Sequence, residues 1–66
     1  MTPKFGVGDY VISFGRNYRI QAQVQMIHPA DRVSRQFYTI KLRWGELRLE
    51  REDYMEHDTL RTLAAI

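Results

Sequence analysis

The stretch that decides the fold class is Arg19-Ile20-Gln21-Ala22-Gln23-Val24-Gln25-Met26. Its apolar side chains occupy every second position, and arginine or glutamine occupies the positions between them. Successive side chains of a β-strand point to opposite faces, so this period of two is typical of a strand with one buried and one solvated face. We therefore expect a strand whose inner side carries Ile20, Ala22, Val24 and Met26.

Shorter segments on both sides of this stretch also have the composition of strands. Residues 10–14 are β-branched or aromatic except for Ser13, and residues 37–43 alternate with Tyr38, Ile40 and Leu42 on the apolar side. Residues 28–35 are polar and contain a proline, which suits a long connection between the second and third strands.

A hairpin is expected after the third strand. Trp44-Gly45 suits its tight turn, and residues 46–50 alternate again. In this strand we expect Leu47 and Leu49 to face inward and Arg48 to face outward.

The end of the chain predicts a 3₁₀ turn over residues 51–54, a short fifth strand over 55–57, and a final helical turn. Asp58 or Thr59 can cap that turn, which carries Leu60 and Leu63. The prediction is thus an all-β chain of five short strands, and their order, with a long loop after the second and a 3₁₀ turn before the last, resembles the SH3-like barrel superfamily. Residues 1–66 form a single domain, with the barrel at about 5–57 and a tail at 58–66.

Composition limits the classes of function. The chain has 66 residues, no cysteine and a formal charge of +2, so disulfides and thiolate zinc sites are excluded. No nucleophile with a base, carboxylate pair or metal cluster stands at a recognisable spacing, and His28 and His57 read as ordinary structural or surface residues. We expect no catalytic residue, metal or cofactor, no membrane span, and a cytoplasmic location.

The segment Gly8-Asp9-Tyr10-Val11 is similar to the Gly-Asp-x-Val that opens Tudor, KOW and related members of the SH3-like barrel superfamily. In physical terms, Gly8 permits an unusual backbone angle, Asp9 can bond nearby amides, and Val11 enters the core. The superfamily hosts many functions, so the resemblance implies a fold and leaves the activity to be argued from a site.

Two narrower resemblances imply different functions. Residues 18–24 resemble the second strand of Tudor domains, and Phe14, Tyr18, Tyr38 and Trp44 could form a cage for a methylated peptide, although Arg43 would repel a cation there. Residues 5–11 resemble the opening of the plasmid-encoded type B dihydrofolate reductases. Residues 47–50 read Leu-Arg-Leu-Glu in place of that family's Val-Gln-Ile-Tyr, so we carry over its barrel and not its reaction.

Polar and aromatic residues of the outward face form the candidate binding surface. Arginine and lysine suit phosphates, while glutamine and aromatic rings suit bases. We therefore expect a non-catalytic module that binds nucleic acid through Arg19, Gln21, Gln23, Lys41, Arg43, Trp44, Arg48, Tyr18 and Phe14. The alternatives are a plain solvated face, or a protein-interaction subunit that includes a homodimer formed through the apolar tail of Leu60, Leu63 and Ile66.

Overall fold

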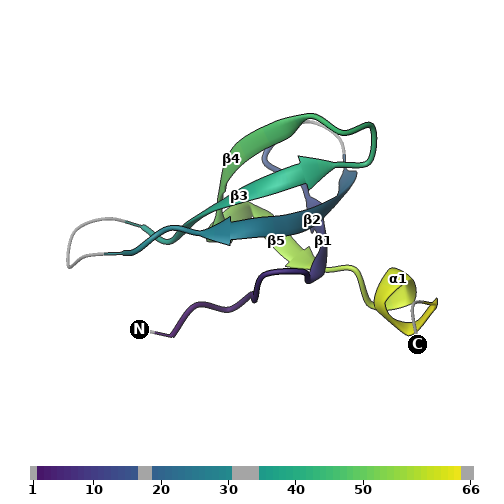
Figure 1. The fold of residues 1–66 in the computed structure, drawn as a ribbon, viewed down its shortest axis with the longest axis horizontal. Helices are drawn as coiled ribbons and strands as arrows, with labels where there is room; N and C mark the ends of the chain where they lie inside the picture. Colours follow the sequence, from purple (N-terminus) through teal and green to yellow (C-terminus); the bar gives the residue numbers. More distant parts are fainter. Residues whose placement is uncertain (1, 17–18, 31–34, 65–66) are drawn as a thin grey trace.

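The computed structural model describes residues 2–16, 19–30 and 35–64. Its five strands form one antiparallel sheet in the order β4-β3-β2-β1-β5 (Figure 1). The elements in chain order are β1 (Tyr10–Ser13), β2 (Ile20–Ile27), β3 (Phe37–Leu42), β4 (Leu47–Arg51), the 3₁₀ turn η1 (Glu52–Tyr54), β5 (Met55–His57) and helix α1 (Thr59–Ala64). The predicted all-β class, with its 3₁₀ turn and short C-terminal helix, is confirmed.

The sheet is open, because no ladder joins its edge strands β4 and β5 within the described part of the chain. It is nevertheless curved enough to bring β4 over β1. The Ser13 hydroxyl donates a 2.6 Å hydrogen bond to Glu50 Oε2, and the Phe14 amide donates to the Tyr54 carbonyl at 2.8 Å. These contacts tie the end of β1 to β4 and η1 without closing a barrel.

One face of the sheet, called here the inner face, holds the core. Its buried apolar side chains come from all strands except β4 and include Val11, Ala22, Val24 and Ile40. Tyr38 is also fully buried, and its ring meets Phe5 edge-on with the ring centroids 5.5 Å apart. The opposite face is called the outer face.

The segment before β1 behaves as its sequence predicts. Gly8 has a φ of 93°, a conformation that residues with a Cβ rarely adopt. The Asp9 carboxylate accepts a 2.8 Å hydrogen bond from the Gly6 amide, and Val11 is completely buried. The Gly8 amide also donates to the Val24 carbonyl at 2.8 Å, which fixes this turn against β2.

The expected inward orientation of Met26 is wrong. The register passes from Val24 opposite Ile40 to Met26 opposite Thr39, so Gln25 is an extra residue in β2. Such a bulge shifts every later side chain to the other face. Met26 is consequently 55% exposed, and Ile27 packs against the core in its place.

The expected orientation of β4 is also wrong, and the hairpin turn gives the reason. Glu46 accepts a hydrogen bond from the Leu42 amide, and the Gly45 amide donates to the Leu42 carbonyl, both at 2.8 Å. The turn therefore contains three residues, Arg43-Trp44-Gly45, and Gly45 takes a positive φ of 97°. The predicted two-residue turn, Trp44-Gly45, would instead place Leu47 opposite the buried Leu42 and therefore on the inner face.

The added residue changes which side chains of β4 face the core. Arg48 lies opposite Ile40 and Glu50 opposite Tyr38, so both charged residues occupy the inner side. Leu47 and Leu49 are 62% and 59% exposed on the outer face. A shift of one residue in the register thus exchanges the inward-facing and outward-facing side chains of β4.

Helix α1 follows β5 directly, and Asp58 caps it. Its carboxylate accepts a hydrogen bond from the Arg61 amide at 3.2 Å, and its carbonyl accepts one from the Thr62 amide at 3.0 Å. Leu60 and Leu63 are exposed, and Ile66 lies outside the described residues. No helix in the described ranges has the length and apolar character needed to cross a membrane.

Candidate nucleic-acid interface

A depression of about 390 Å³ opens where the β3–β4 turn meets the outer face and α1. Three cationic side chains and one indole contribute to it, and no carboxylate does. Its lining consists of Gln23, Lys41, Leu42, Arg43, Trp44, Gly45 and Arg61. We call this the basic depression.

The sheet register places the first members of the basic depression. Gln23 on β2 lies opposite Lys41 on β3, so both side chains project from the same outer face. The Arg43 amide donates to the Gln21 carbonyl at 3.0 Å, which extends the β2–β3 pairing into the turn. Arg43 and Trp44 are thereby presented by a short turn anchored on both sides.

Trp44 is 56% exposed, so it is not a core residue. Its indole N–H donates a 3.2 Å hydrogen bond to Glu46 Oε1, while Arg48 donates to the other oxygen of that carboxylate at 2.9 Å. The hydrogen bonds from Arg48 first, and then from Trp44, lower the pKa of Glu46. The contact uses only the edge of the indole, so it leaves the ring faces available for stacking.

Arg61 enters the basic depression from α1. Its guanidinium carbon lies 4.5 Å from the centroid of the Tyr10 ring, a cation–π contact that holds the helix against β1. Arg61 is not among the binding residues predicted from the sequence. The Asp58 cap indicates a helix there, but the alternation of the strands carries no signal for how that helix packs.

The cations of the basic depression differ from most other arginines in their partners. Arg19, Arg35, Arg48 and Arg51 each form an ion pair with a carboxylate. Among the described residues, no ion pair involves Lys41, Arg43 or Arg61. Their positive charge is therefore not neutralised by a neighbouring carboxylate within the described parts of the chain.

The structure brings together only part of the predicted binding set. Gln23, Lys41, Arg43 and Trp44 line one depression, and Gln21 is paired with Arg43 through the backbone beside it. Arg48 is wrongly predicted to share their face, because the three-residue turn places it on the inner side.

Two predicted residues lie elsewhere, and a third lies outside the described residues. Arg19 forms an ion pair with Glu56 of β5, and Phe14 is tied through its amide to η1. Tyr18 lies outside the described residues. The aromatic cage as predicted is not formed, because Tyr38 is fully buried in the core.

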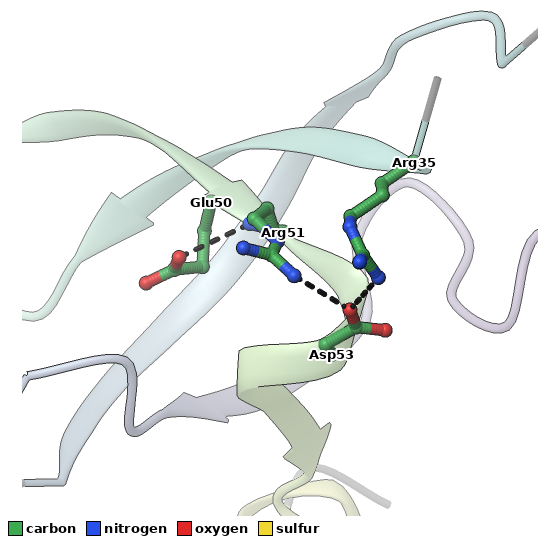
Figure 2. Close-up of polar contacts among 4 residues, drawn as sticks. All are labelled: Arg35, Glu50, Arg51 and Asp53. Carbon is green, nitrogen blue, oxygen red and sulfur yellow. Dashed lines mark hydrogen bonds and ion pairs between the residues drawn. The ribbon is translucent and has the colours of Figure 1, made fainter. Parts of the chain in front are cut away.

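A second charged cluster lies at the other end of β4, where Arg35 and Arg51 converge on Asp53 (Figure 2). Both contacts measure 2.9 Å, and they lower the pKa of Asp53, the hydrogen bond from Arg51 having the larger effect. The Arg51 guanidinium also lies 4.7 Å from the Tyr54 ring centroid. Both guanidiniums here contact the same carboxylate, so this cluster offers less to an anionic ligand than cations without a carboxylate partner.

The histidines make structural contacts. His28 Nε2 lies 2.7 Å from the Thr39 hydroxyl, and the His57 ring is tilted against Phe5 with centroids 4.7 Å apart. No group of three histidine, aspartate or glutamate side chains converges in the described ranges as a metal site requires.

No family model, curated protein or solved structure matches this chain. The function is therefore inferred from the chain's own side chains and their arrangement.

Proposed function

We propose that the protein is a non-catalytic module of the SH3-like superfamily that binds nucleic acid, with single strands preferred, through the basic depression. The observation that carries the proposal is the convergence of Lys41, Arg43 and Arg61 around the exposed Trp44, with no carboxylate in the lining. The strand order, the 3₁₀ turn before β5 and the Gly8-Asp9 lead-in support the superfamily assignment.

The chemistry of the depression fits a phosphodiester chain carrying unstacked bases. Three cations without carboxylate partners can contact phosphates, which contribute most of the affinity in such complexes. An exposed indole can stack on any base, because every base has a π-face. A base is available for stacking only when it is not already enclosed in a duplex, which favours a single strand.

Salt dependence tests the proposal directly. With three phosphate contacts, raising the salt concentration fourfold should weaken binding of a labelled oligonucleotide by roughly 20- to 40-fold, because counterions are released on binding. Fluorescence anisotropy with single- and double-stranded oligonucleotides at 50 and 200 mM salt measures this change. Absence of binding to either at 50 mM would remove the proposal and leave a plain solvated surface.

Trp44→Ala should weaken oligonucleotide binding by roughly 1 to 3 kcal/mol, the range for losing one base-stacking aromatic. The stability of the fold should change by less than about 1 kcal/mol, because Trp44 is more than half exposed. The anisotropy titration and urea denaturation measure the two effects. A matched control is Leu60→Ala, which truncates an exposed side chain outside the lining of the depression. Equal affinity of the two variants would show that the indole makes no contact.

The native chain offers a second readout of the same contact. Trp44 is the only tryptophan, so its fluorescence reports on the basic depression alone. Stacking on a base should change its emission as oligonucleotide is added, and added salt should restore it.

A further inference from the structure

Among the described residues, no strand pairs with the outer edge of β4, and this edge carries two exposed leucines, Leu47 and Leu49. In an antiparallel ladder, residues alternate between those whose N–H and C=O point to the partner strand and those whose groups point away. Backbone hydrogen bonds of Leu42 with Glu46 and of Gln36 with Glu52 fix this alternation. The backbone groups of Arg48 and Glu50 therefore point to β3, and those of Leu47, Leu49 and Arg51 point to the open edge.

A free edge of this kind is a template for another strand. We propose that two copies of this chain pair antiparallel through β4, about a two-fold axis at Leu49. In this register Leu49 lies opposite Leu49 of the second copy, and Leu47 lies opposite Arg51. The inference is independent of nucleic-acid binding.

Charge complementarity favours a second copy as the occupant, and it favours this register over the two neighbouring ones. With the axis at Leu49, Arg48 of each copy lies opposite Glu50 of the other on the inner face. An axis at Arg48 would set arginine against arginine, and an axis at Glu50 would set glutamate against glutamate. All three registers use the outward-pointing backbone groups of Leu47, Leu49 and Arg51, so the charges decide among them. The sequence Arg48-Leu49-Glu50 is thus complementary to itself when reversed.

The side chains shown in Figure 2 fit the same pairing. In the single chain, Glu50 Oε1 accepts a 3.0 Å hydrogen bond from the Arg51 amide, one of the donors that faces the open edge. In the pair, that amide donates to the Leu47 carbonyl of the second copy. Glu50 Oε1, released from that amide, then faces the Arg48 guanidinium of the second copy, while Oε2 keeps its hydrogen bond from the Ser13 hydroxyl.

The leucines supply the apolar contact. Leu47 and Leu49 are 62% and 59% exposed on the outer face of one short strand, where a monomer gains nothing from them. Pairing brings the two copies of Leu49 together and covers each Leu47 with the aliphatic stem of Arg51. The apolar residues of α1 remain outside this contact.

Cysteine cross-linking tests the register, because the chain has no cysteine of its own. In the proposed pair, the two Cα atoms of residue 49 lie about 5.5 Å apart, within the range that a disulfide spans. The two Cα atoms of residue 47 lie about 13 Å apart, which no disulfide spans. Under mild oxidation Leu49→Cys should become a covalent dimer, and the equally exposed Leu47→Cys should remain mostly uncross-linked.

Sedimentation of the native chain completes the test. Its mass should rise from 7.9 kDa towards twice that value with concentration, and Leu49→Lys should raise the dissociation constant at least about 100-fold, since two copies of the side chain are lost. Leu60→Lys, the matched control on α1, should leave it unchanged, with circular dichroism confirming the fold of both variants.

Three results would overturn the inference. They are a native chain that stays at 7.9 kDa at several hundred micromolar, equal cross-linking of Leu47→Cys and Leu49→Cys, or a dimer that only Leu60→Lys dissociates. The first result would show that the edge of β4 does not pair with a second copy. The last would show that the copies associate through the tail at residues 58–66.

Discussion

Tyr38→Ala is expected to remove a large fraction of the free energy of unfolding. Tyr38 is fully buried, its ring contacts Phe5, and its hydroxyl donates a 2.5 Å hydrogen bond to Glu52 Oε2 while accepting one from the Phe5 amide at 3.3 Å. Removing a buried aromatic ring costs roughly 3 to 5 kcal/mol. A chain of this size has a total stability of about 3 to 10 kcal/mol. Circular dichroism with urea denaturation measures the loss, and a cooperative transition at the native midpoint would contradict the account.

The matched variant Tyr38→Phe isolates the hydroxyl and predicts a pH dependence. Burial, followed by the hydrogen bond to Glu52, raises the pKa of Tyr38 from 10.0 to about 12. The folded state therefore favours the neutral phenol. The resulting stability is complete below pH 10 and is lost as the pH rises from 10 to 12.

We expect the native chain to lose roughly 2 to 3 kcal/mol more than Tyr38→Phe over that interval. Urea denaturation at pH 9, 10, 11 and 12 compares the two proteins. Parallel curves across the interval would show that Tyr38 ionises equally readily in both states.

The double variant Lys41→Gln/Arg43→Gln should lose roughly 100-fold in oligonucleotide affinity at 50 mM salt, because each phosphate contact contributes about tenfold at that concentration. The slope of log affinity against log salt should also become shallower by about 1.4 to 1.8. Anisotropy titrations at several salt concentrations measure both. Neither side chain is buried, so the fold should persist.

Arg35→Gln is the control for this variant. Arg35 precedes β3, so it lies at the opposite end of that strand from the turn that carries Arg43, and it is paired with Asp53. The substitution should change the affinity by less than about twofold, as expected for a charge already matched by a carboxylate. If it weakened binding by the roughly tenfold expected for one phosphate contact, the protein would be attracting nucleic acid by its net charge alone.

The period of two in β2 and β3 predicted the strands because it reports directly on a sheet with one buried face. That signal fails where one residue is added. Gln25 enters β2 as a bulge, and Arg43 enters the turn before β4, and each insertion reverses the side chains that follow. Both depend on how neighbouring strands pair, which alternation within one strand does not record.

The lining of the basic depression was likewise predictable from the sequence only in part. Gln23, Lys41, Arg43 and Trp44 share a surface because the β2–β3 pairing holds as expected. Arg61 joins them only because α1 packs on Tyr10, a contact between elements that local sequence patterns do not encode. Arg48 was predicted on the wrong face because the turn before β4 contains Arg43 as a third residue.

The most direct measurement of the central claim is nuclear magnetic resonance of the ¹⁵N-labelled chain during titration with a short single-stranded oligonucleotide. Binding in the basic depression predicts that the largest shift changes fall on the Trp44 indole and on the amides of Gln23, Lys41, Arg43 and Arg61. The amides of Arg35 and Asp53, in the cluster where Arg35 and Arg51 converge on Asp53, should shift little. Changes confined to that cluster, or no changes at an oligonucleotide excess in low salt, would contradict the account.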